Sequence, residues 1–147
     1  MANGDSTSRT QGRTVGRQRR RSFDGPALRP ATKRFLRDDH HHLFVSYEDG
    51  RAVGFVTGVE ITHPDKGTEM FVYELSVDEA YQRRGVARAL LHELEQLARD
   101  LECYGMWVVT GEDNTAALAT YEASGATTER AQAVLVWSFE SGTTSLK

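Results

Sequence analysis

The sequence contains a single cysteine, Cys103, and no long hydrophobic run. One thiol excludes an intrachain disulfide framework and a zinc site built from cysteines. A membrane-spanning helix needs about 20 mostly apolar residues, which no segment supplies, and the start of the chain lacks the apolar core of a secretory signal. We therefore expect a cytoplasmic protein that does not associate with a membrane.

Positive charge is concentrated at the start of the chain. The first 22 residues hold six arginines and one acid, whereas the whole 147-residue chain has a net charge of −3. Segment 1–26 has almost no apolar residues with which to offset its ordering entropy. We predict a disordered basic tail over 1–26, one folded domain over 27–141 and a disordered tail over 142–147. The basic tail lacks interleaved aromatic residues, so a nucleic-acid partner is not favoured.

The folded domain is expected to open with a helix and a β-hairpin. A short helix is predicted over 31–38. Two β-rich runs, 43–47 and 52–61, then flank Asp49 and Gly50. Asp-Gly supplies the positive φ that a tight hairpin turn requires, so these runs should pair as antiparallel strands.

A third strand is predicted over 69–77, and it carries a candidate catalytic acid. Side chains alternate between the two faces of a strand. Regular alternation would direct Glu74 to one face and place on the other face a set of larger side chains, namely Phe71, Tyr73, Leu75 and Val77.

The second half of the chain predicts two helices and two strands. Segment 85–101 has apolar residues at spacings of three and four, the pattern of an amphipathic helix. A short strand is expected over 106–110 and a second helix from Asn114 to about Ser124. A last strand is expected over 134–139. Strands that alternate with helices indicate an α/β fold.

The loop before the first long helix has the composition of an anion site. Gly85 lets the backbone approach a ligand, and the backbone N–H groups of a helix N-terminus favour negative charge. Donors and cations surround it, because Gln82, Arg83, Arg84 and Arg88 lie in the same segment. A pyrophosphate group would fit this loop.

In this segment the chain resembles the GNAT superfamily of acyl-CoA-dependent N-acyltransferases. The cofactor signature of that superfamily is Arg/Gln-x-x-Gly-x-Gly/Ala, matched here by Gln82, Gly85 and Ala87. The helix from Asn114 to Gly125 is a second match. The resemblance implies a mixed, mostly antiparallel sheet flanked by helices and acetyl-CoA as cosubstrate, without a metal. The segments around Glu74 are most similar to the aminoglycoside 3-N-acetyltransferase branch.

The resemblance also implies roles for individual residues. Glu74 is the first candidate for the base that takes a proton from the acceptor amine, with Glu60 and Glu69 as alternatives. Tyr121 is the candidate that protonates or hydrogen-bonds the CoA thiolate. The residues expected to bind the cofactor are Leu75, Ser76, Val77, Gln82, Arg83, Arg84, Gly85, Val86, Ala87, Arg88 and Asn114.

The acceptor side departs from the family pattern. Family members begin with a strand and one or two helices that wall the acceptor pocket, and here this span looks missing or shortened. The acidic body would suit a small cationic amine such as an aminoglycoside, and a homodimer is a further hypothesis. A non-catalytic CoA-binding module is the alternative.

No metal is expected at His40, His41 and His42, because neighbouring residues of an extended segment alternate faces.

Overall fold

The computed structural model describes residues 6–9 and 27–139 of the chain. The chain divides into two compact units, Met1–Val108 and Val109–Lys147. The first unit contains every strand of the described sheet together with two α-helices, and the second contains one α-helix. No helix in the described ranges has both the length and the apolar character needed to cross a bilayer.

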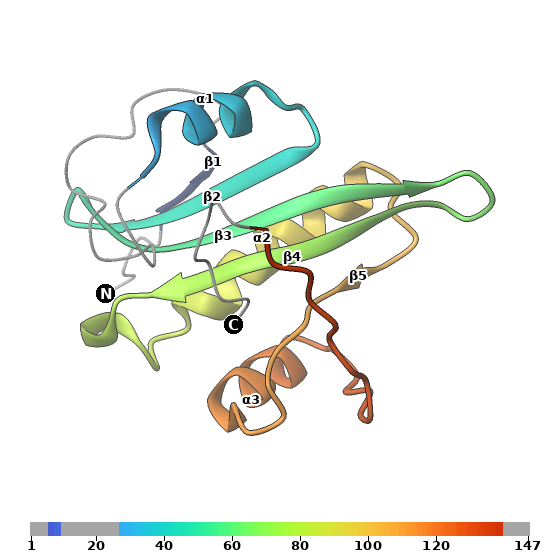
Figure 1. Cartoon of the computed structure of the whole chain (residues 1–147). Helices are drawn as coiled ribbons and strands as arrows, with labels where there is room; N and C mark the ends of the chain where they lie inside the picture. The colour runs from blue at the N-terminus through green and yellow to red at the C-terminus, as the bar shows by residue number, and fades with distance from the viewer. Residues whose placement is uncertain (1–5, 10–26, 140–147) are drawn as a thin grey trace. The chain divides into compact units, whose positions relative to one another are not determined.

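The first unit is organised around a twisted sheet whose strands are ordered as in the sequence (Figure 1). Neighbours are antiparallel except for the last pair, which is parallel. A parallel pair needs a crossover connection, and a helix provides it here. The strands are β1 (Ser6–Arg9), β2 (His41–Glu48), β3 (Arg51–His63), β4 (Gly67–Val77) and β5 (Met106–Trp107).

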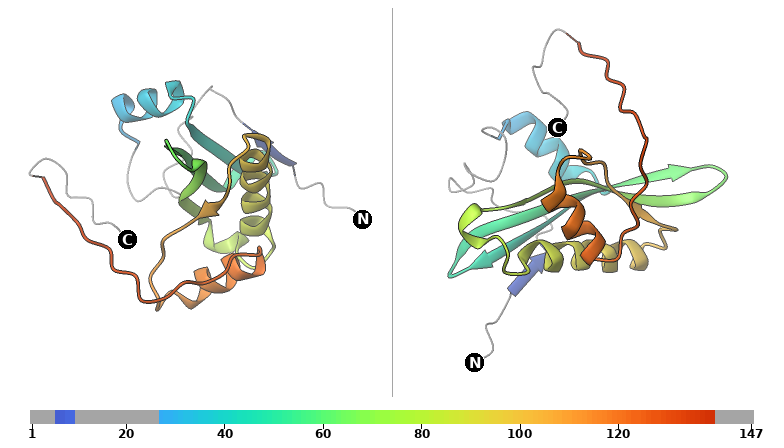
Figure 2. Two further views of the ribbon diagram at one scale, coloured as in Figure 1. Left: turned by 90° about the vertical axis from the view of Figure 1, so that its right-hand side faces the viewer. Right: turned by 90° about the horizontal axis from the view of Figure 1, so that it is seen from below.

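Two helices of the first unit lie on opposite sides of this sheet (Figure 2). Helix α2 (Val86–Asp100) packs on one face. Its inward residues are buried, namely Val86, Leu90, Leu91, Leu94, Leu97 and Ala98. Helix α1 (Arg29–Arg37) approaches the other face, where the ring of Phe35 lies 5.3 Å from that of His41. A short 3-10 helix, η1 (Glu79–Tyr81), links β4 to α2.

Glycines on β3 allow α2 to pack closely against the sheet. A Cβ added at Gly54 would lie 2.9 Å from the backbone oxygen of Ser76 and 3.3 Å from Val86 Cγ1. A Cβ at Gly58 would lie 2.7 Å from Leu94 Cδ1. Both glycines therefore face α2, and their lack of a side chain fits the core.

We expect Gly54→Ala to lower the free energy of unfolding by about 1–3 kcal/mol, because a backbone oxygen cannot yield as a side chain can. Gly105→Ala is the matched control, since nothing lies within 4 Å of a Cβ at Gly105. Urea unfolding followed by circular dichroism measures both variants. Equal stability of the two variants would contradict the packing described.

Most predicted elements of the first unit are confirmed. The hairpin turn has positive φ at both Asp49 and Gly50, with values of 48° and 74°. Two expectations need correction. Strand β1 lies inside segment 1–26, which was predicted to be disordered, and β5 ends at Trp107 although a strand was predicted to Thr110. The remainder of segment 1–26, like segment 142–147, lies outside the described residues.

The predicted face pattern of β4 is wrong. Glu74 pairs with Thr57, whereas Val72 pairs with Gly58, the next residue of β3, so Tyr73 is an extra residue. Such a β-bulge reverses the alternation. As a result Val77 and Met70 both lie on the sheet face that α2 covers. Phe71 lies on the opposite face, together with Glu74.

The second unit contains α3 (Thr115–Ala123), which confirms the predicted helix. Its chain turns away at Gly125, whose φ is 104°. The last strand predicted over 134–139 is wrong, since that segment forms no strand in the described structure. Its run of β-branched and aromatic residues is typical of a strand, but a strand also needs a hydrogen-bonded neighbour, and Trp137 is 77% exposed.

Candidate functional site

The loop between η1 and α2 is shaped as the sequence predicted. Gly85 has φ 82° and forms the N-cap of α2, and Arg83 also has a positive φ of 61°. The first hydrogen bond of the helix runs from Ala89 N–H to Gly85 O at 3.0 Å. The N–H groups of residues 86–88 therefore have no acceptor inside the helix. They form a positively polarised end that suits a phosphate oxygen.

Two residues predicted to bind the cofactor have side chains that contact the protein itself. Gln82 Nε2 donates to Val77 O at 3.1 Å, which ties the loop to the end of β4. Val86 is buried, so its backbone rather than its side chain is available to a ligand. Sequence reasoning missed this anchoring role of Gln82.

The arginines of the loop differ in their surroundings. The Arg84 guanidinium lies 3.6 Å from Glu48 Oε1 and 5.3 Å from the centre of the Tyr81 ring. These contacts hold its charge beside the loop. Arg83 and Arg88 are exposed and form no ion pair with any described residue. Both therefore present a positive charge to solvent at the helix start.

The segment Leu75–Val77 lies at the end of β4 that leads into this loop. These residues pair with Val56, Phe55 and Gly54 of β3. On the other side, β5 pairs with β4 at Met70 and Phe71 and then ends. Strand β5 therefore does not run beside Leu75–Val77. A strand edge that is not covered by a neighbouring strand offers N–H and C=O groups to an extended ligand.

Glu74 lies on the sheet face opposite α2, and it is exposed. Its backbone N–H donates to Thr57 Oγ1 at 3.0 Å, and Thr57 is only 5% exposed. At a bulge one residue is left out of the ladder, and a buried N–H without an acceptor would be costly. The Thr57 hydroxyl therefore stabilises the bulge that gives Glu74 its orientation. Sequence reasoning missed Thr57, because regular pairing would place Tyr73 opposite it and only the bulge brings Glu74 to that position.

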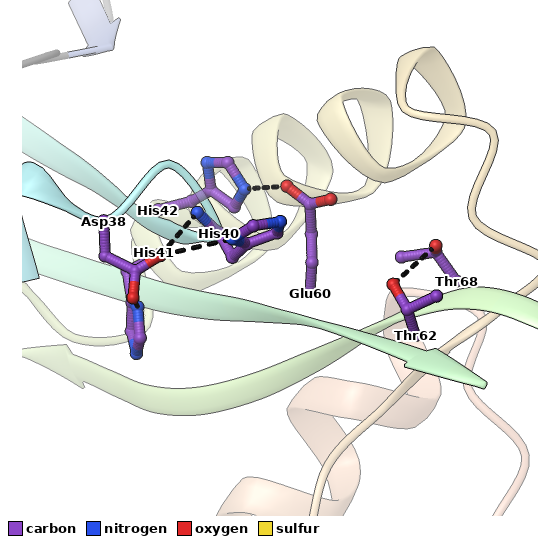
Figure 3. Close-up of polar contacts among 7 residues, drawn as sticks. All are labelled: Asp38, His40, His41, His42, Glu60, Thr62 and Thr68. Atoms are coloured by element: carbon purple, nitrogen blue, oxygen red, sulfur yellow. Dashed lines mark hydrogen bonds and ion pairs between the residues drawn. The ribbon is translucent and has the colours of Figure 1, made fainter. Parts of the chain in front are cut away.

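The two alternative bases are engaged elsewhere. Glu60 Oε1 lies 2.7 Å from His42 Nε2, and both residues are on the α2 side of the sheet (Figure 3). Glu69 shares the face of Glu74, but its Oε2 accepts from Tyr104 Oη at 2.8 Å. This hydrogen bond lowers the pKa of Glu69, with smaller contributions from His63 and Trp107. A lowered pKa makes Glu69 a weaker base.

The second unit holds the two remaining candidates. Asn114 Oδ1 accepts from Ala117 N–H at 3.2 Å and caps α3, as its residue type predicts. Tyr121 lies on α3 and is partly buried. Burial raises the pKa of the Tyr121 hydroxyl, so this group keeps its proton at neutral pH.

The first unit combines a sheet whose last strand ends early with an anion-binding loop at the start of the helix that covers it. This combination defines an α/β domain with a helix N-terminus that suits an anion. Residues 13–126 match the Acetyltransferase (GNAT) family, and the chain belongs to this family. The mixed, mostly antiparallel sheet flanked by helices agrees with the fold predicted from the sequence.

Two curated proteins illustrate the relatives of the chain. N-alpha-acetyltransferase RimI of Mycobacterium tuberculosis is 35% identical over 102 residues, which are 69% of this chain and 62% of that protein. N-acetyltransferase family 8 member 2 of Rattus norvegicus is 29% identical over 99 residues, which are 67% of this chain and 43% of that protein. The chain thus spans 43% to 62% of the length of these two relatives.

Solved structures of aminoglycoside acetyltransferases have the same fold. One, from an uncultured soil metagenomic sample, superposes with a TM-score of 0.67 at 26% identity and covers 78% of this chain and 77% of that chain. The aminoglycoside N-acetyltransferase AAC(6')-Iy in complex with CoA has a TM-score of 0.64 at 23% identity and covers 76% of this chain and 84% of that chain. At this identity the second comparison describes the fold alone.

Proposed function

We propose that the chain transfers the acetyl group of acetyl-CoA to a primary amine. The observation that carries the proposal is the loop at residues 82–88, in which free helix N–H groups adjoin cationic side chains at the end of β4. Membership of the GNAT family supports acetyl-CoA as the ligand. A positively charged loop fits the pyrophosphate of acetyl-CoA. The segment Leu75–Val77 offers backbone groups to the pantetheine arm of the same molecule.

Each proposed cofactor contact follows from the chemistry of the residue. The N–H groups of Val86, Ala87 and Arg88 would donate to phosphate oxygens, and the Arg83 and Arg84 guanidiniums would add charge. Asn114 is assigned to the cofactor by family resemblance. Acetyl-CoA itself supplies the acetyl group as an activated thioester.

The proposed chemical step needs a base, an oxyanion donor and an acid. An ammonium group cannot attack a thioester, so the Glu74 carboxylate takes its proton. A backbone N–H within Leu75–Val77 donates to the carbonyl oxygen as negative charge develops on it. Tyr121 hydrogen-bonds or protonates the leaving thiolate. Burial raises the pKa of Tyr121, so its hydroxyl stays protonated and suits a hydrogen bond to the thiolate better than full proton transfer.

The identity of the acceptor amine has two supported candidates. The acidic composition and the fold shared with aminoglycoside acetyltransferases support an aminoglycoside or another small cationic amine, with the 3-N branch suggested by the segments around Glu74. The relative RimI, an N-alpha-acetyltransferase by name, supports a peptide amino terminus. A thiol-release assay with acetyl-CoA against aminoglycosides, polyamines and peptides tests both candidates.

A non-catalytic CoA-binding module is the competing function. Calorimetry that detects acetyl-CoA binding, together with no thiol release for any amine of the panel, would favour it and contradict acetyl transfer. Absence of acetyl-CoA binding would contradict both functions.

Thr57 provides a further prediction about this site. We expect Thr57→Val to lower kcat by about 10-fold and to leave the KM for acetyl-CoA unchanged, because the lost acceptor at the bulge misplaces Glu74. The pH–rate profile should also shift, since the surroundings of the base change. Thr57→Ser keeps the hydroxyl and should restore both quantities. A loss of kcat in the serine variant equal to that in the valine variant would contradict the role of the hydroxyl.

A further inference from the structure

Helix α1 has a strongly basic surface that the proposed reaction does not use. Four of its nine residues are cationic and none is acidic, the cations being Arg29, Lys33, Arg34 and Arg37. An open groove of about 650 Å³ runs along this helix and the loop that follows it. It is lined by Pro30, Lys33, Arg34, Arg37, Asp38, Asp39 and His40.

Of the two acids that line this groove, Asp38 has partners within the protein, whereas Asp39 is exposed and forms no ion pair with a described residue. Asp38 Oδ1 accepts from His40 N–H at 2.9 Å, and the two oxygens of Asp38 lie 3.3 Å and 3.2 Å from Nδ1 of His40 and His41 (Figure 3). In contrast, Lys33, Arg34 and Arg37 are exposed and have no ion-pair partner within residues 6–9 and 27–139. The groove therefore presents cationic groups that are available to an anion.

The groove lies on the same side of the sheet as Glu74. Phe35 of α1 packs against His41, which pairs with Val59 of β3, and Glu74 pairs with Thr57 of the same strand. His41 and Glu74 are thus two strands apart and offset by two residues. With strands about 4.8 Å apart and about 3.3 Å per residue, their Cα atoms are about 12 Å apart.

The charge on Arg34 and Arg37 has one structural explanation. Cations in the last turn of a helix stabilise its dipole, and both residues lie there. This explanation does not extend to Arg29 and Lys33, which precede the last turn. The helix therefore carries more positive charge than capping alone requires.

We propose that the acceptor amine belongs to a molecule that also carries carboxylates, most simply a peptide with acidic residues at its second to fourth positions. The inference rests on the proposed function and chooses between its two acceptor classes. With the terminal amine at Glu74, an extended peptide spans about 10 Å to its fourth residue at about 3.3 Å per residue, which directs those carboxylates toward His41 and the cations of α1. An aminoglycoside carries positive charge and gains nothing from α1.

Steady-state thiol release tests the proposal. The substrates are a peptide with glutamate at positions two to four, the same peptide with glutamine there, and a set of aminoglycosides. The variants are Arg34→Gln and Arg37→Gln, with Lys66→Gln as the control because it removes one exposed charge in the β3–β4 turn. Circular dichroism checks that α1 remains folded in each variant.

We expect the glutamate peptide to have a KM about 10-fold below that of the glutamine peptide, and expect Arg34→Gln and Arg37→Gln to remove most of that difference. The kcat and the KM for acetyl-CoA should be unchanged in all variants. The Lys66→Gln variant should keep the wild-type preference for the glutamate peptide. Equal KM values for the two peptides, a preference for aminoglycosides, or unchanged kinetics in both arginine variants would overturn the inference while leaving acetyl transfer intact. Absence of thiol release from every acceptor would instead refute the proposed function.

Discussion

Glu74→Gln should lower the turnover of acetyl transfer by about 10²–10⁴-fold, the usual contribution of a positioned general base. Glutamine has nearly the same shape as glutamate but does not accept a proton at neutral pH. Glu74 is exposed on the face opposite α2. Affinity for acetyl-CoA should change little, because the loop at residues 82–88, which we propose binds the phosphates, is a separate part of the fold. Thiol release and calorimetry measure the two quantities.

Glu69→Gln is the matched control for this experiment. Glu69 lies on the same strand and face, but its carboxylate accepts a hydrogen bond from Tyr104. The control should keep most of its turnover. If Glu69→Gln were inactive and Glu74→Gln were active, Glu69 would be the base and the assignment of that role to Glu74 would be wrong.

Gly85→Glu should reduce affinity for acetyl-CoA by at least about 100-fold. The residue has φ 82°, a conformation that costs an ordinary side chain about 1–2 kcal/mol. Strain alone is too small to account for such a loss. The larger effect is electrostatic, because the glutamate carboxylate would lie where the helix N-terminus is expected to bind phosphate.

Two substitutions at Gly85 separate strain from charge. Nothing lies within 4 Å of a Cβ at this position, so neither variant meets a steric clash in the free protein. Gly85→Asn tolerates the left-handed conformation and should bind acetyl-CoA within a few-fold of the wild type. Gly85→Ala carries the strain without the charge and should be intermediate. Tight binding of acetyl-CoA by Gly85→Glu would show that the phosphates bind elsewhere.

Local sequence patterns predicted the hairpin and the long helix because each depends on neighbouring residues. Asp49 and Gly50 set the turn by their backbone preferences, and both have the positive φ expected of them. The spacing of apolar residues in 86–100 directs one face of α2 to the sheet. Gly85 likewise ends the loop and starts the helix through its own φ. The backbone shape of this loop was therefore predictable from the sequence.

The remaining features depend on partners that a local pattern does not specify. The bulge at Tyr73 reverses the faces of β4, and it arises from pairing with β3 rather than from the residue itself. Segment 134–139 has the β-branched and aromatic composition of a strand, but composition does not provide a neighbouring strand. For the same reason the hydrogen bond between Glu74 N–H and Thr57 emerged only from the three-dimensional register.

The most direct measurement is thiol release from acetyl-CoA by the full chain, with the acceptor recovered and its mass determined. We predict that an acceptor amine gains one acetyl group for each thiol released, and that Glu74→Gln lowers both signals by about 10²–10⁴-fold while acetyl-CoA still binds. Release of thiol without an acetylated amine, or an undiminished rate in Glu74→Gln, would contradict acetyl transfer to an amine with Glu74 as the base.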